Sequence, residues 1–150
     1  MLCYRDEYNQ MLGDKRGDFR VMLVHEWLPQ ALSATAAQEQ GGESWYLFGH
    51  CTEVTALPAS TKQWADIFAR FGAKLENVNV GCCGMAGTYG HEVKNHANSL
   101  AIYALSWQQA MQRLPRNRCL VTGYSCRSQV KRIEGSGVRH PLQALLEIMG

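Results

Sequence analysis

The 150-residue sequence contains no apolar run that approaches the roughly 18 residues needed to span a bilayer. Its first residues also lack a charged segment followed by an apolar one, so we expect no signal peptide. Neither charge sign dominates, because 15 basic residues face 13 acidic ones and the net charge is +2. The densest charged stretch, residues 15–20, mixes both signs, which indicates a solvated turn rather than a nucleic-acid or lipid surface. These absences favour a globular cytoplasmic protein.

Motifs for catalysis and nucleotide binding are also missing. The sequence has no GxSxG, no P-loop and no dinucleotide fingerprint. The glycine-rich stretch GMAGTYG, at 84–90, has neither the lysine of a phosphate loop nor an acidic residue about 20 positions later. No acid/base pair with a third orienting group is evident. We therefore expect no catalytic residues here and no substrate turnover by this chain alone.

Hydrophobic periodicity predicts one core with alternating strands and helices. The expected strands cover residues 44–50, 75–80 and 118–122, and the expected helices cover 4–12, 18–32, 60–71, 91–114, 125–133 and 141 onward. This order predicts an α/β fold, a three-layer sandwich with a short, mostly parallel sheet, preceded by an N-terminal helical segment. We expect residues 1–43 to be a helical lead-in and linker and residues 44–150 to be the α/β domain. Because a helical pattern starts at once, without a cap, we expect the chain to come from the end of a longer polypeptide.

Cysteine is the residue type whose placement is unusual. Of six cysteines, four follow the ends of predicted strands: Cys51, Cys82, Cys83 and Cys126. Since the carboxyl ends of parallel strands share one edge of a sheet, these four thiols are expected to converge there. Cys119 lies inside a predicted strand and Cys3 in the first helix, where cysteine behaves as a small buried hydrophobe.

Four thiolates suit tetrahedral zinc or an iron–sulfur cluster. Cys82 and Cys83 are adjacent, so their side chains diverge, which favours a cluster with several metal atoms over a single zinc ion. The glycines around them, Gly84 above all, would let the backbone approach a bound group and donate N–H groups to it.

Three histidines near these features have open roles. His50 and His91 flank the cysteine loops, and each could hydrogen-bond a ligand sulfur or be an ordinary surface or capping residue. His140 precedes Pro141 and could cap the last helix or face the site.

The cysteine pattern resembles a known domain. Cys51, the CCG of residues 82–84 and Cys126 are similar to the cysteine-rich CCG domain of heterodisulfide reductase and of the iron–sulfur subunit of glycolate oxidase. The stretches CCGMAGTYGHE, ANSLAIYALSW, TGYSCRSQ and VRHPLQALLE resemble the C-terminal end of bacterial FAD-linked oxidases of the D-2-hydroxyglutarate and D-lactate dehydrogenase type.

The resemblance implies an electron-transfer module of an FAD-linked 2-hydroxy acid oxidoreductase. Cys51, Cys82, Cys83 and Cys126 would be the ligands of an iron–sulfur cluster, 4Fe-4S or alternatively zinc, with Gly84 beside it. FAD would lie in a flavin domain of the same polypeptide, and electrons would pass to an acceptor, in the cytoplasm or at the inner membrane. The last motif of that domain is CxxC, whose first position here is Gly123, so the five-cysteine set is incomplete. A zinc-stabilised docking domain and a thiol–disulfide redox module remain alternatives.

Overall fold

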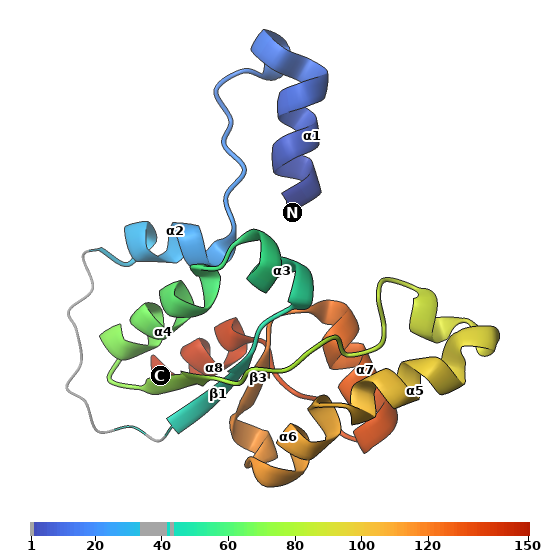
Figure 1. The fold of residues 1–150 in the computed structure, drawn as a ribbon. Coiled ribbons are helices and arrows are strands. Elements are labelled where there is room, and N and C mark those ends of the chain that lie inside the picture. The colour runs from blue at the N-terminus through green and yellow to red at the C-terminus, as the bar shows by residue number, and fades with distance from the viewer. Residues whose placement is uncertain (1, 34–41, 43) are drawn as a thin grey trace. The chain divides into compact units, whose positions relative to one another are not determined.

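The computed structural model of the chain describes residues 2–33, 42 and 44–150 (Figure 1). The chain forms two compact units, one through residue 36 and one from residue 37 onward. Among the described residues, no helix combines the length and the apolar character needed to cross a membrane. Each unit is described by itself below.

The first unit contains two α-helices and a short 3-10 turn. Helix α1 covers Leu2–Leu12, η1 covers Gly13–Arg16 and α2 covers Val24–Ala31. The second helix was predicted to start at residue 18, which is wrong. It starts later because the Glu26 carboxylate accepts a hydrogen bond from the backbone N–H of Leu23, 2.9 Å away, which fixes Leu23 as the N-cap. Most of the predicted loop at 33–44 lies outside the described residues.

The second unit is built on a three-stranded parallel sheet. Strands β1 (Ser44–Phe48), β2 (Lys74–Asn77) and β3 (Cys119–Val121) lie in the order β2-β1-β3. In the register, Trp45 pairs with Leu75, and Phe48 pairs with Val121. The α/β class and the parallel sheet are thereby confirmed. Strand β2 is shorter than the predicted 75–80.

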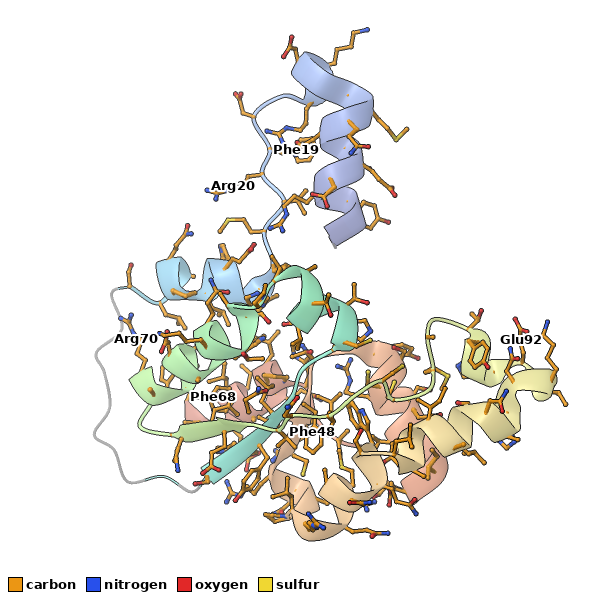
Figure 2. All side chains as sticks on the ribbon, viewed as in Figure 1. Phe19, Arg20, Phe48, Phe68, Arg70 and Glu92 are labelled. Carbon is orange, nitrogen blue, oxygen red and sulfur yellow. The ribbon has the colours of Figure 1, made fainter. Side chains whose placement is uncertain are left out.

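Helices cover both faces of the sheet (Figure 1). Trp45 and Leu47 point to one face, where Trp45 meets Phe68 of α4 (Ser60–Arg70) at 6.4 Å between ring centroids. Helix α8 (Pro141–Ile148) shares this face, because its N-cap His140 packs edge-on against Trp64 of α4 at 5.7 Å. Phe48 alternates to the other face and packs with the buried side chains of α5 (His96–Ala104), α6 (Trp107–Arg113) and α7 (Tyr124–Glu134). Phe68, on α4, and Phe48, at the end of β1, are labelled in Figure 2.

Three local expectations are wrong. The helix predicted over 91–114 is divided into two 3-10 turns, η2 (Tyr89–His91) and η3 (Val93–Asn95), and the helices α5 and α6. A short helix, α3 (Cys51–Ala56), follows β1 where none was predicted. The Ser60–Gln63 spacing in the sequence is that of a capping box, which predicts Ser60 as the N-cap of α4; instead the N-cap is Ala59, which makes no side-chain capping bond, and Ser60 is buried in the first turn.

Candidate functional site

The four cysteines expected at the sheet edge come from three consecutive loops. Cys51 is the first residue of α3, directly after β1. Cys82 and Cys83 lie in the loop after β2, and Cys126 lies in the first turn of α7, after β3. Cys51 is exposed, Cys82 is half-buried, and Cys83 and Cys126 are buried at 3% and 1% exposure. The group therefore runs from solvent into the core.

These thiols interact with one another in pairs. The thiol of Cys126 hydrogen-bonds the sulfur of Cys83, which lowers the pKa of Cys83 to about 7 and raises the pKa of Cys126. Burial raises the pKa of Cys82, and hydrogen bonding with Cys51 acts in the same direction. Negative charge on Cys51 also raises the pKa of Cys126. The structure thus brings together all four cysteines predicted at this edge, and each of the four is a free thiol.

Gly84 shapes the loop that carries the adjacent pair. Its backbone N–H donates a hydrogen bond to Cys82 Sγ, at 3.3 Å, as expected for a glycine beside a thiolate site. Its φ of +84° lies in the left-handed region, and a Cβ at this position would overlap the carbonyl oxygen of Ser99 in α5. Only glycine allows the loop to pass this close to the helix.

A buried polar group that the sequence did not reveal anchors the same loop to α5 and α7. Gln129 Nε2 donates to Ser99 Oγ at 2.9 Å, and both residues are fully buried. Arg132 donates to the carbonyl oxygen of Gly90 at 2.5 Å and to Ser99 Oγ at 3.3 Å. Gln129 follows Cys126 by three positions on α7, and that helical spacing is the one signal that could have placed it beside the site.

The start of the loop is fixed by α6. Trp107 Nε1 donates to the carbonyl oxygen of Gly81 at 2.9 Å, and Ser106 Oγ accepts from the backbone N–H of Gly81 at 3.0 Å. The Trp107 ring, 1% exposed, lies 5.1 Å from Phe48 and 6.1 Å from Tyr103 between centroids. The cysteine loop is therefore tied to the hydrophobic core at both ends.

The remaining predicted residues have clear positions. Cys119 is buried inside β3, its thiol donates to the carbonyl oxygen of Pro115 at 3.5 Å, and burial raises its pKa to about 11. Cys3 lies within α1, in the other unit. His140 Nδ1 accepts from the backbone N–H of Leu142 at 3.2 Å, so the capping role is confirmed. His91 is exposed in η2.

The donor set fits a thiophilic metal group in chemistry. The four thiols lie close together, and the backbone N–H of Gly84 donates to the sulfur of Cys82. Thiolates are soft ligands, which select zinc or iron–sulfur clusters. In the described part of the chain, no three His, Cys, Asp or Glu side chains are arranged around a common point for a metal ion. Protonated thiols hydrogen-bond one another in pairs instead of surrounding a common point. Metal binding would release their protons.

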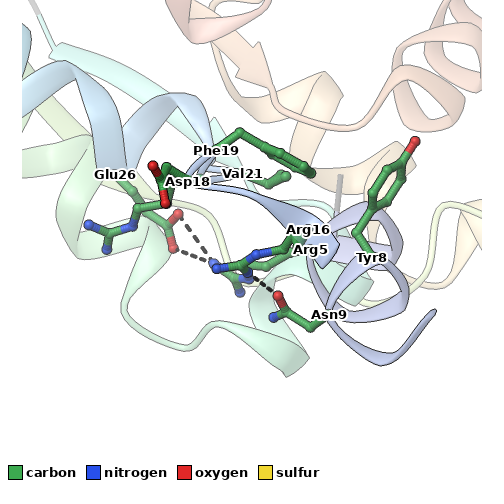
Figure 3. A pocket seen from close by; sticks show the side chains of 9 residues that line it. Arg5, Tyr8, Asn9, Arg16, Asp18, Phe19, Val21 and Glu26 are labelled. Atoms are coloured by element: carbon green, nitrogen blue, oxygen red, sulfur yellow. Dashed lines mark hydrogen bonds and ion pairs between the residues drawn. The ribbon is translucent and has the colours of Figure 1, made fainter. Parts of the chain in front are cut away.

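A separate pocket lies within the first unit (Figure 3). It measures about 410 Å³ and carries arginines and acidic residues. The guanidinium of Arg5 bridges both carboxylate oxygens of Glu26, at 3.0 and 3.3 Å, and Arg16 hydrogen-bonds Asn9. Because Arg5 and Glu26 neutralise each other at its wall, we assign no chemistry to this pocket.

The chain is similar to bacterial dehydrogenases. It is 74% identical over 149 residues to the D-2-hydroxyglutarate dehydrogenase of Escherichia coli (strain K12). It is 71% identical over 149 residues to that of Pantoea ananatis (strain AJ13355), and 50% identical over 157 residues to that of Haemophilus influenzae. Each match takes in 99% of this chain, which spans only 15% of the relative's length. No protein-family profile and no solved structure matches the chain.

These similarities support the resemblance to D-2-hydroxyglutarate dehydrogenases. The assignment of residues 44–150 to a CCG domain remains a prediction.

Proposed function

We propose that this chain is the electron-transfer module of an FAD-linked 2-hydroxy acid oxidoreductase, and that Cys51, Cys82, Cys83 and Cys126 hold an iron–sulfur cluster in it. The observation that carries the proposal is the convergence of four thiols from three loops at one sheet edge. When bound, such a cluster accepts and releases electrons at a potential set by its surroundings. The high identity to D-2-hydroxyglutarate dehydrogenases supports that substrate for the whole polypeptide.

In this proposal the protein's own residues tune and shelter the site. The Gly84 N–H donates to Cys82 Sγ and would stabilise negative charge on that sulfur. The buried Cys83 and Cys126 would face the core, whereas Cys51 and Cys82 would face solvent. The solvent side would therefore admit the flavin domain and the electron acceptor, whether that acceptor is in the cytoplasm or at the inner membrane. We keep 44–150 as the extent of the domain, with 1–43 as its helical lead-in.

Arg127 has a structural role in this arrangement. Its guanidinium donates to the carbonyl oxygens of Val121 and Thr122, at 2.9 and 3.0 Å, and so closes the carboxyl end of β3. Burial lowers its pKa, and the charge of Cys126 opposes that effect. A thiolate at Cys126 would therefore have a fixed cation next to it.

The deciding experiment replaces Cys126 by serine in the whole enzyme, with Cys119→Ala as the matched control. Serine is a poor ligand for iron, so we expect flavin reduction by D-2-hydroxyglutarate to persist and onward transfer to an acceptor to fall sharply. Cys119 lies inside β3, so its replacement should leave both half-reactions intact. Stopped-flow measurement of the two half-reactions distinguishes these outcomes. Normal onward transfer in Cys126→Ser would refute the relay.

A thiol–disulfide module is the second candidate, because Cys83 and Cys126 share a hydrogen bond that holds the pKa of Cys83 at about 7. Thiolate character at neutral pH is what attack on a disulfide requires. The absorption spectrum of anaerobically purified protein separates the candidates. A brown protein supports the cluster, a colourless protein with bound zinc supports a docking domain, and a metal-free protein with reversible thiols supports the redox module.

A further inference from the structure

An open pocket of about 380 Å³ lies in the second unit, between α6 with its flanking residues and the segment that follows β2. Its apolar lining comes from Val78, Val80, Leu105, Ala110 and Leu114. Leu105 is 78% exposed, although leucine is among the residue types that are most often buried. Apolar side chains that gather around a hollow on the surface, rather than lying scattered, mark a surface that a partner covers.

The backbone beside this pocket has free hydrogen-bonding groups. Strand β2 is at an edge of the sheet, since the strand order is β2-β1-β3. The chain still follows β1 one residue beyond β2, where the N–H of Val78 donates to the carbonyl oxygen of Leu47 at 2.8 Å. The backbone groups of the next two residues, Asn79 and Val80, form no hydrogen bond with any residue that the structure describes. An open edge with free N–H and C=O groups is a template for an added strand.

The charge at the pocket favours an acidic partner. Arg113, in the last turn of α6, is the one charged side chain among the described residues that line the pocket. It is exposed, and within the described ranges it has no ion-pair partner. Arg116 and Arg139 of the same unit differ, because they are paired with Glu134 and Glu147. A carboxylate on a partner would complement Arg113, whereas a basic segment would be repelled.

The pocket also adjoins the cysteine loop. Ser106 lines the pocket, and its hydroxyl accepts the N–H of Gly81, the residue before Cys82. A segment bound along Val80 would therefore lie beside the start of the loop that carries the adjacent thiols. The chain spans only 15% of the length of the relatives it matches, so most of a polypeptide of that kind lies outside these residues. A domain that exchanges electrons with the thiols has to approach them, and this surface is next to them.

We propose that this pocket, together with the free edge at Asn79 and Val80, docks an extended segment of the flavin domain of the same polypeptide. The segment adds to the edge as a strand, places an apolar side chain in the pocket and directs a carboxylate at Arg113. Its backbone hydrogen bonds supply affinity, and its apolar and acidic side chains supply specificity. The flavin domain enters as the partner through the proposed function, on which this inference rests.

The test places a photo-cross-linker in the pocket of the whole enzyme. In Leu105→p-benzoyl-L-phenylalanine, near-ultraviolet light bonds the benzophenone to whatever lies against the pocket, and mass spectrometry of the digest identifies the joined peptides. The control is the same change at Leu146, which is 71% exposed on α8, on the other face of the sheet. We expect residue 105, but not residue 146, to be joined within one polypeptide to an acidic peptide outside these 150 residues. A link to a second copy, a link to the same peptide from residue 146, or no link outside the chain would overturn the proposal.

Two pairs of variants in the cross-linking enzyme test how the segment is recognised. Arg113→Glu repels a carboxylate and should lower the cross-link yield at least about fivefold, whereas Arg113→Lys keeps the charge and should retain about half of it or more. Asn79→Pro removes a backbone N–H and should lower the yield to the same extent, whereas Asn79→Ala keeps that donor and should not. Both positions are exposed, so each variant should keep the wild-type unfolding temperature. An unchanged yield in Arg113→Glu would overturn the acidic partner, and an unchanged yield in Asn79→Pro would overturn the added strand.

The cross-link does not involve the thiols, so its failure is distinguishable from failure of the proposed function. In Cys126→Ser the cross-link at residue 105 should persist while onward electron transfer falls. A persistent cross-link with normal onward transfer would refute the relay and leave the docking surface standing. Loss of onward transfer in Cys126→Ser, in an enzyme that gives no cross-link at residue 105 even as wild type, would overturn the docking surface and leave the relay.

Discussion

Gly84→Ala is the most informative stability test of the cysteine loop. At φ +84°, an alanine loses about 1–2 kcal/mol from the left-handed backbone alone. Its Cβ would also overlap the Ser99 carbonyl oxygen and lie 3.0 Å from the carbonyl carbon and 3.2 Å from Cα of that residue. Because those atoms belong to the backbone of α5, the overlap requires a shift of the loop or the helix, at about 1–3 kcal/mol. We therefore expect a loss of about 2–5 kcal/mol in the free energy of unfolding.

Gly87→Ala in the same loop is the matched control. Its φ is +68°, and an added Cβ would meet nothing within 4 Å, so it carries the backbone cost without the overlap. Urea unfolding followed by circular dichroism, with reductant and chelator present, would measure both variants. The expected excess for Gly84→Ala is about 1–3 kcal/mol, against a typical total stability of about 5–15 kcal/mol. Equal losses would refute the close approach of the loop to α5.

Two further predictions concern polar contacts away from the thiols. Burial lowers the pKa of His140 to about 4, so between pH 4 and 6.5 the unfolded chain binds more protons, and stability should fall as pH drops through this window. Because the ring is partly accessible, we expect this effect to change the free energy of unfolding by about 1–2 kcal/mol across the window. The measurement compares the pH dependence of unfolding in the wild type and in His140→Asn, whose side chain can cap the helix but does not titrate. Parallel curves for the two proteins would contradict the prediction. Tyr103→Phe removes the hydrogen bond that the Tyr103 hydroxyl donates to the Glu134 carboxylate at 3.0 Å. The same carboxylate also accepts a hydrogen bond from the Arg116 guanidinium at 2.8 Å. We expect Tyr103→Phe to lower the free energy of unfolding, measured with denaturant, by about 1.5 kcal/mol. The control Tyr124→Phe changes a residue that is 80% exposed and should cost at most about 0.5 kcal/mol. A loss in Tyr103→Phe no larger than in the control would contradict the prediction.

Local patterns predicted the parts of the fold that depend on a single strong face. In α4 the apolar residues Trp64, Ile67 and Phe68 stand at i, i+3 and i+4, the spacing that predicts one helix face, and all three are buried. The order of strands and helices predicted the parallel sheet, and with it the edge at which the thiols meet. In α8 the same spacing predicts a face of Leu142, Leu145, Leu146 and Met149, and this is only partly right, because Leu145 is buried while Leu146 is 71% exposed.

The rest depended on contacts between distant residues. Helix 91–114 is interrupted at Ser106 and Trp107, whose side chains hydrogen-bond Gly81, 25 and 26 positions earlier in the chain. Gln129 and Ser99 are 30 positions apart, and neither has a local pattern that marks it as buried. Single-sequence periodicity carries no information about such pairings.

Trp107 gives the protein a built-in fluorescent reporter of its cysteine loop. Its indole N–H is bonded to Gly81, at the start of that loop, while Trp45 and Trp64 lie on the opposite face of the sheet. A group that absorbs visible and near-ultraviolet light, bound at the thiols, would take up the emission of Trp107 by energy transfer. A colourless ion would leave that emission in place and change only its wavelength. Because Trp27, Trp45 and Trp64 also emit, the part of the emission that a Trp107→Phe variant lacks is the signal that reports on the occupant of the loop.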